Sequence, residues 1–220
     1  MRDAYHEELA ALNHQLVEMT RLVGSAISRA STALLDADLG LAESVIVADD
    51  AVDSIRDELD RRAMDLLARQ QPVASDLRTI VATLKMSGDL ERMGDLARHV
   101  ARAARRRFPE SAVPAPLRAT IVEMGQVAER LVAKTGSVIA SRDVEAALEI
   151  ETDDDDMDRL HRALFTELLD VSAPYSVEAA IDVTLVSRYY ERFADHAVAV
   201  SRRVVYLVTG QQPRELAETV

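Results

Sequence analysis

The sequence contains no cysteine and no tryptophan, and aromatic residues make up only 4% of its 220 residues. The absence of cysteine excludes disulfide bonds and thiolate metal sites. Because strands favour aromatic residues and helices favour Ala, Leu, Glu and Arg, this composition predicts a helical protein rather than a sheet protein. No apolar run approaches the ~18 residues of a membrane-spanning helix, so any membrane role must pass through a partner.

Basic residues are outnumbered, with 26 Lys and Arg against 38 Asp and Glu, a net charge of −12. An acidic chain is a poor candidate for coating nucleic acid. The one basic run, "RHVARAARRR" at 98–107, lies near the end of an expected helix, where cations are stabilising, and has no interleaved aromatics for base stacking. The N-terminal "MRDAYHEELAAL" is acidic and lacks an apolar core segment, so no secretion signal is visible. The absence of cysteine fits a reducing cytoplasm.

Prolines fall only where helical patterns break, and three of the six lie in "FPESAVPAP" at 108–116, near the middle of the chain. No stretch shows sustained strand alternation. The sequence therefore predicts an all-α protein with six long helices, each of about 30 residues and ~45 Å. Their expected ranges are 4–36, 39–70, 74–107, 115–140, 143–171 and 176–208.

The two halves repeat each other. Residues 87–102 match 187–202 at an offset of 100, and residues 38–59 match 143–164 at an offset of 105. "GSAI" at 24–27 answers "GSVI" at 136–139. The repeat predicts two tandem antiparallel three-helix bundles, spanning residues 1–110 and 111–220.

Each half carries two pairs of acids spaced four residues apart, on two different expected helices. Like charges at this spacing cost a helix a few tenths of a kcal/mol, roughly, and we see no base between Glu91 and Asp95 at helical reach. The apolar stripes Met86–Val100 and Val186–Val200 lie on the opposite face, so the acids are expected to point away from the core. The pairs are Asp49/Asp53 with Glu91/Asp95, and Asp154/Asp158 with Glu191/Asp195.

Four converging carboxylates repel one another unless a cation neutralises them. Oxygen-only ligation suits hard ions, so the sequence predicts one cation site per half at a surface patch formed by these eight acids. The alternative is solvated surface charge, which is the usual state of a single acid pair. The Asp153–Asp156 run is equally compatible with a charge cluster near a helix start.

Enzymatic alternatives have weaker support. A ferritin-type di-iron site needs Glu-x-x-His on two helices, and the nearest match is Asp158-x-x-His161, with Arg56 at the equivalent place in the first half. His196 could reach the acids of the last helix, while the other histidines fit surface or helix-end positions. A carboxylate-metal oxidase or phosphohydrolase, and an inert helical scaffold, both remain open as alternatives.

"DLERMGDLARHVAR" and "YYERFADHAVAVSRR", each closing one unit, resemble the PhoU family, and the Arg/Ala-rich composition suggests a PhoY-like actinobacterial member. The resemblance extends from about Leu9 to Gly210 and includes four E(D)xxxD motifs in register. One departure is Leu96, where the second unit keeps His196 after its motif aspartate. This difference predicts that the two patches bind metal differently.

The resemblance implies a non-enzymatic regulator of phosphate homeostasis. It implies partners in the cytoplasmic components of the phosphate ABC transporter and in the sensor histidine kinase of the phosphate regulon, with repression of starvation signalling when phosphate is plentiful. Family likeness also implies Fe, Zn, Mg or Mn ions at the carboxylate motifs, a homodimer, and peripheral association with the inner membrane through partners.

Overall fold

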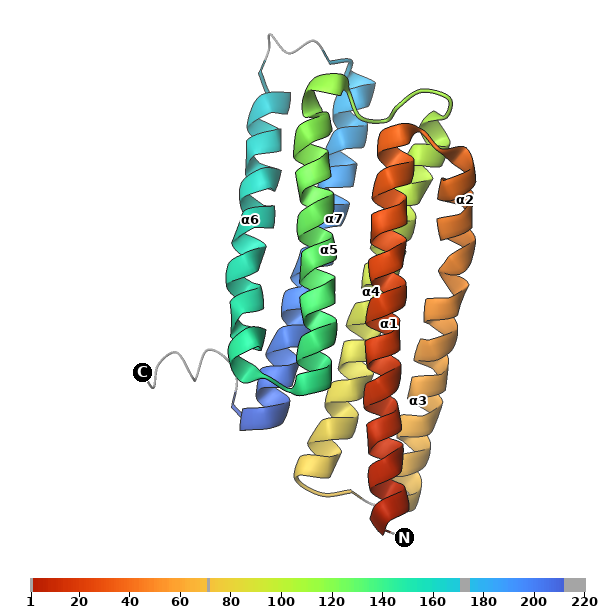
Figure 1. The fold of residues 1–220 in the computed structure, drawn as a ribbon, viewed down its shortest axis with the longest axis vertical. Helices are drawn as coiled ribbons and strands as arrows, with labels where there is room; N and C mark the ends of the chain where they lie inside the picture. Colours follow the sequence, from red (N-terminus) through yellow and green to blue (C-terminus); the bar gives the residue numbers. More distant parts are fainter. Residues whose placement is uncertain (1, 71, 171–174, 212–220) are drawn as a thin grey trace.

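The structure is a computed structural model that describes residues 2–70, 72–170 and 175–211, and the described residues are almost entirely helical (Figure 1). None of the described helices is both long and apolar enough to cross a membrane. The elements in chain order are α1 Arg2–Asp36, α2 Leu39–Ala48, α3 Asp50–Gln70, α4 Ser75–Arg107, the 3₁₀ turn η1 Ala115–Leu117, α5 Arg118–Ser141, α6 Val144–Leu168 and α7 Val177–Thr209.

The all-α prediction is confirmed, and the expected helix ranges match to within a few residues except at one position. The rod expected at 39–70 is interrupted at Asp49, which divides it into α2 and α3. Residue capping explains several ends. Asp38 accepts a hydrogen bond from the Leu41 amide at the start of α2, and Asp143 does the same for Ala146 at the start of α6.

The helices run alternately up and down, and the two halves of the chain lie side by side (Figure 1). Four helices form the centre: α1 packs against α4 and α5, and α7 packs against α4 and α5. The α2/α3 rod flanks the first half and α6 flanks the second (Figure 1). Like elements of the repeat therefore meet, because α1 contacts α5 and α4 contacts α7.

One continuous hydrophobic core links the two halves. The stripes expected from Met86 to Val100 on α4 and from Val186 to Val200 on α7 are buried. The Tyr190 hydroxyl, fully buried, makes a 2.7 Å hydrogen bond with the Ser31 hydroxyl of α1. This hydrogen bond favours one orientation of α7 relative to α1, because leaving the buried Tyr190 hydroxyl without a partner would cost ~1–3 kcal/mol.

Charged residues also join α4 to α7. Oδ2 of Asp89, on α4, accepts a hydrogen bond of 2.8 Å from Nε of Arg203. Its other oxygen, Oδ1, lies 3.1 Å from Nδ1 of His196. Near the other end, the buried Asp182 of α7 is bound by Arg106, at 2.6 Å, and by Arg107. The basic run at the end of α4 thus binds α7, which supports the helix-end interpretation over nucleic-acid binding.

The repeated glycines Gly24 and Gly136 lie where α1 faces α5, but their surroundings differ. A Cβ added at Gly136 would lie 2.5 Å from Oγ1 of Thr20, a buried residue of α1. A Cβ added at Gly24 would meet Val132 at 3.4 Å, an ordinary contact. The close approach of α1 and α5 therefore requires glycine at position 136 but not at position 24.

We expect Gly136→Ala to lower the free energy of unfolding by about 1–3 kcal/mol, since overpacking displaces Thr20. The matched control Gly24→Ala should be neutral or stabilising by up to ~1 kcal/mol through helix propensity. Chemical denaturation monitored by circular dichroism measures both. Adding Thr20→Ala should recover part of the loss in Gly136→Ala, and equal losses for the two glycine variants would contradict this account.

Candidate functional site

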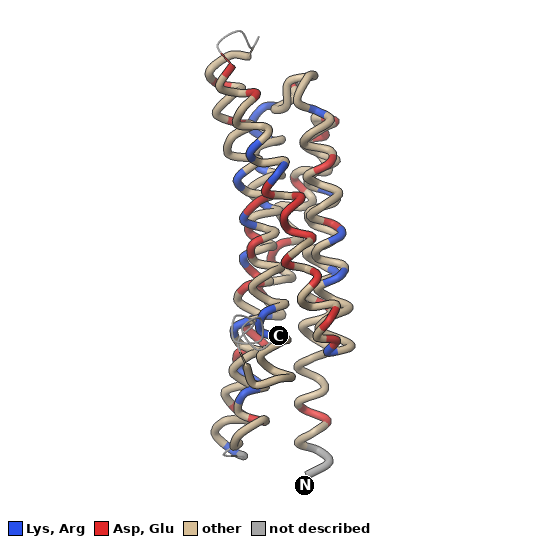
Figure 2. Tube along the Cα trace, turned by 90° about the vertical axis from the view of Figure 1, so that its left-hand side faces the viewer, with Lys and Arg blue, Asp and Glu red and all other residues tan. Residues whose placement is uncertain are grey.

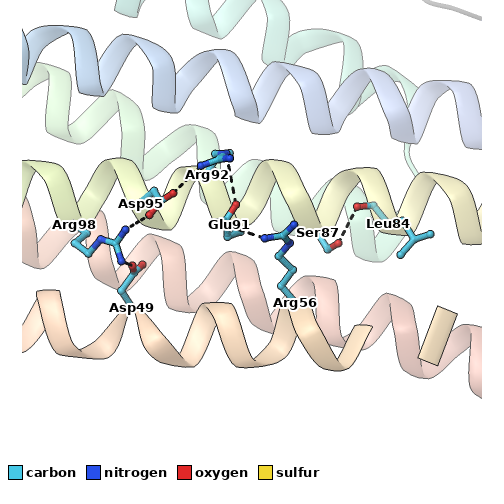
Figure 3. Close-up of polar contacts among 8 residues, drawn as sticks. All are labelled: Asp49, Arg56, Leu84, Ser87, Glu91, Arg92, Asp95 and Arg98. Atoms are coloured by element: carbon cyan, nitrogen blue, oxygen red, sulfur yellow. Dashed lines mark hydrogen bonds and ion pairs between the residues drawn. The ribbon is translucent and has the colours of Figure 1, made fainter. Parts of the chain in front are cut away.

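The first carboxylate cluster lies between α4 and the α2/α3 rod (Figure 3). Glu91 and Asp95 extend from α4 toward the rod, and Asp49 stands at the break between α2 and α3. Asp49 is only 5% exposed, and its Oδ1 would lie 3.0 Å from a Cβ at Gly94. The cluster is therefore recessed between helices, which corrects the expectation of a surface patch pointing away from the bundle.

Burial is the main reason that the pKa of Asp49 rises to about 6, and the charges of Asp53, Asp95 and Glu91 raise it further. Arg98 acts in the opposite direction and lowers it. Because all three acids influence Asp49, the predicted members of the first cluster do lie within electrostatic range of one another.

Arginines neutralise this cluster, which the sequence analysis did not anticipate (Figure 3). Arg98 Nη1 lies 2.6 Å from Asp49 Oδ2, in an ion pair without hydrogen-bond geometry, and its Nη2 contacts Asp95. Arg92 pairs with Asp95 at 3.1 Å, and Arg56 reaches Glu91 at 3.7 Å. The expectation that no base stands within helical reach of the Glu91/Asp95 pair was wrong.

The second cluster joins α6 to α7 on the flank that faces the viewer in Figure 2, where acidic segments gather about half-way along the molecule. Burial raises the pKa of Asp154 to about 7, helped by the charges of Asp195, Asp158 and Glu191. Burial, and then Asp195, also raise the pKa of Glu191 despite its contact with Arg188. The four predicted residues are thus electrostatically coupled here too.

Neutralisation differs between the clusters. Val198 occupies the repeat position of Arg98. Among the described residues, the four acids of the second cluster form one ion pair, that between Arg188 and Glu191. The second oxygen of Glu191, Oε2, is buried with no hydrogen-bond partner. A buried carboxylate oxygen without a donor is costly and suits a bound cation.

Metal binding can be tested against this geometry. In the described part of the chain, no three His, Asp or Glu side chains stand arranged as a ready metal-ligand set. In the first cluster, Arg98 contacts both Asp49 and Asp95, so an added ion would have to displace its guanidinium. In the second, the unpartnered oxygen of Glu191 and the raised pKa of Asp154 indicate negative charge that a cation would stabilise.

His6 and His14 are exposed, as expected, whereas the other three histidines contact other helices. His196 turns to Asp89 of α4 instead of the acids of its own helix, while Leu96 is buried in the core. His161 Nδ1 lies 2.5 Å from Ser187 Oγ, and His99 stacks on Tyr189 with ring centroids 5.1 Å apart. The difference between the clusters comes from Arg98 and Val198, not from Leu96 and His196.

The residues that sequence reasoning missed were visible in part. Arg98 is three positions after Asp95, a spacing that brings helical side chains together, and its repeat partner is Val198. That mismatch within otherwise matching segments was the available signal. The reach of Arg98 to Asp49 on another helix depends on packing and had no local signal.

Comparison with known proteins fits this architecture. The PhoU domain matches the chain twice, at residues 16–104 and 121–204, once in each half. The chain belongs to the PhoU family. It is 50% identical, over 97% of its length and 100% of the relative, to a Mycobacterium tuberculosis protein named phosphate-specific transport system accessory protein PhoU homolog 2. A Mycobacterium leprae protein named PhoU homolog 1 is 47% identical over 98% of this chain and 97% of the relative.

Solved PhoU structures have the same fold. The crystal structure of PhoU from Pseudomonas aeruginosa superposes with a TM-score of 0.86 at 32% identity, covering 94% of this chain and 100% of that one. The Streptococcus pneumoniae phosphate transport system regulatory protein PhoU gives the same TM-score at 26% identity, covering 94% and 98%. The resemblance noted in the repeated motifs is confirmed.

We expect Asp154→Asn to stabilise the metal-free protein at pH 8 but not at pH 4. The folded-state pKa of Asp154, about 7, lies above the unfolded value of 3.8. The folded form therefore holds the proton more tightly, and stability falls as pH rises through this window. The gain at pH 8 should be about 1–2 kcal/mol after solvent screening.

Urea denaturation of both proteins in EDTA, repeated at each pH, measures this difference. A gain that is the same at pH 4 and pH 8 would mean that the substitution acts through packing and not through the charge of Asp154.

Proposed function

We propose that this PhoU-family protein is a non-enzymatic regulator that links the phosphate ABC transporter to the sensor histidine kinase of the phosphate regulon. It represses phosphate-starvation signalling when phosphate is plentiful. The observation that carries the proposal is the match of both repeats to PhoU, together with 50% identity over the full length of a relative named as a transport accessory protein. The arginine-neutralised first cluster also favours a binding surface over a metal-based catalytic centre.

The protein acts, in this proposal, as a cytoplasmic homodimer of two-unit chains, divided at about residue 110, that reaches the inner membrane only through its partners. Its acidic flanks suit reversible, charge-guided contacts, because complementary charge raises association rates and suppresses wrong partners. The net charge of −12 makes nucleic acid an unsuitable partner.

A cation binds at the second cluster in this proposal, held by carboxylates of Asp154, Asp158, Glu191 and Asp195. The candidate ions are Fe, Zn, Mg and Mn. Among these, hard ions such as Mg²⁺ and Mn²⁺ suit a site whose ligands are all carboxylate oxygens. The ion would supply the positive charge that the buried Glu191 oxygen lacks. In the first cluster, the guanidinium of Arg98 supplies the positive charge. Metal binding at Asp49, Asp53, Glu91 and Asp95 stays a prediction.

Deleting the gene tests the regulatory role. We expect phosphate-starvation genes to be expressed in phosphate-rich medium, because the repressing contact is lost. Transcript levels of the starvation genes measure this, with the parent strain and a strain complemented with the intact gene as controls. Normal repression in the deletion strain, after removal of any second PhoU homologue, would contradict the proposal.

Exchanging Arg98 and Val198 tests whether the arginine decides which of the two clusters binds a metal ion. We expect Val198→Arg to weaken Mn²⁺ or Zn²⁺ binding by at least about tenfold, since a fixed cation then competes for the second cluster. Arg98→Val should add cation uptake at the first cluster. Equilibrium dialysis with elemental analysis measures both, and circular dichroism confirms folding.

Glu91→Gln with Asp95→Asn is the matched control for Glu191→Gln with Asp195→Asn. We expect the second pair of substitutions to remove most of the bound metal and the first pair to remove little. Equal losses from the two would show that Arg98 does not exclude metal from the first cluster.

A further inference from the structure

A groove of about 690 Å³ runs between the first half of α4 and the last half of α7, apart from both carboxylate clusters. Its apolar side chains are well exposed for their size, at 42% for Leu77, 40% for Val81 and 37% for Tyr206. Small residues such as Ala82 and Ala199 line it between them. Apolar surface of this kind between two helices is the usual seat of a third helix.

The lining of the groove is basic in a strongly acidic protein. Arg78, Lys85, Arg202 and Arg203 all line it, and no acidic residue does. Arg202 and Arg203 are paired with Glu151 and Asp89, outside the lining. Arg78 lies over the ring of Tyr206 at 5.7 Å.

Lys85 has no ion pair or hydrogen bond within the described chain. Arg78 and Lys85, two cations at the groove, thus have no carboxylate partner among the described residues. Both stand on the same side of α4 as Leu77 and Val81, since these residues are spaced by three and four positions.

The internal repeat provides a comparison for this groove. At an offset of 100, Leu77, Arg78 and Val81 correspond to Val177, Glu178 and Ile181, and Ala82 corresponds to Asp182. In the second unit, Asp182 and Glu178 bind arginines of the neighbouring central helix. The equivalent face is therefore neutralised by carboxylates from within the chain.

In the groove, Arg78 and Ala82 stand in place of those two acids. Arg78 and Lys85 bind no carboxylate within residues 2–70, 72–170 and 175–211, and Ala82 lines the open groove. The described part of the chain therefore supplies no carboxylate that completes this face.

We propose that this basic groove, lined by Ala74–Lys85 of α4 and Ala199–Tyr206 of α7, docks an acidic amphipathic helix of a protein partner. The α4 side spans 11 residue steps, or about 16 Å, which accommodates roughly three turns of a partner helix. Apolar residues of that helix at i, i+3 and i+4 pack on Leu77, Val81 and Tyr206, and its flanking Asp or Glu residues pair with Arg78 and Lys85.

A protein helix fits better than an anionic membrane. A flat lipid surface is bound by protruding cations, whereas Arg78 lies over the ring of Tyr206, and Leu77 and Val81 line a groove between two helices. The inference deepens the regulatory proposal, on which it rests for the nature of the partner. Its test uses the isolated protein alone, so its failure is distinct from normal repression in the deletion strain.

The probe is a fluorescein-labelled helical peptide of about 14 residues with Leu at i, i+3, i+4 and i+7 and Glu elsewhere. We expect saturable binding to the full chain by fluorescence anisotropy. Arg78→Glu with Lys85→Glu should weaken binding by at least about tenfold, because charge reversal repels the peptide. Val81→Ala should weaken it less, through lost apolar contact.

The matched control is Arg105→Glu with Arg130→Glu, an equal charge change at exposed arginines that line neither α4–α7 groove wall. It should leave binding within about twofold of the parent, since screened distant charges contribute little. A peptide with Lys in place of Glu should not bind. A photo-crosslinking version of the Glu peptide should attach within residues 74–85 or 199–206.

Several results would overturn the proposal. One is an equal loss of binding in the control variant, and another is crosslinking elsewhere. A third is absence of peptide binding together with binding to phosphatidylcholine vesicles that contain about one third phosphatidylglycerol, which would assign the groove to lipid. Finally, if the parent self-associates by light scattering and the charge-reversed variant does not, the occupant is a second copy of this chain.

Discussion

The reciprocal ion pairs between α4 and α7 hold the two halves of the molecule in register. Asp89 near the middle of α4 is bound by His196 and Arg203 of α7, while Asp182 of α7 is bound by Arg106 and Arg107 of α4. Both acids are largely buried, so each would be expensive without its partners. Burial alone would raise the pKa of Asp89, but the hydrogen bonds and charges of His196 and Arg203 lower it overall.

Once this register is fixed, the positions of the two carboxylate clusters follow. Each central helix presents its apolar stripe to the other half and its motif acids to its own flanking rod, α2/α3 or α6. The clusters are therefore similar in placement, yet they are neutralised differently. The first has the guanidinium of Arg98 between its acids, and the second has a buried carboxylate oxygen of Glu191 without a hydrogen-bond partner. The two copies of the motif therefore differ in how their negative charge is neutralised.

Much of this could be predicted from the sequence because it depends on local periodicity. The proline positions predicted where helices end, and the apolar stripe from Met86 to Val100 predicted the buried face of α4. The matched offsets predicted the second copy of each motif. The break at Asp49, the turn of His196 toward Asp89 and the reach of Arg98 to Asp49 could not be predicted in the same way. Each depends on which helix stands opposite, and periodicity within one helix carries no information on its neighbour.

The pairing of like elements has a consequence for the origin of the fold. Helix α1 packs on its own repeat α5, and α4 packs on its own repeat α7. Contacts between identical surfaces are the signature of a two-fold homodimer. A single three-helix ancestor that dimerised would already have had this core, and joining the two copies through residues 108–117 would have changed its connectivity without rebuilding its packing. In one joined chain the two copies can differ at single positions, as Arg98 and Val198 do, a freedom that a symmetric dimer does not have.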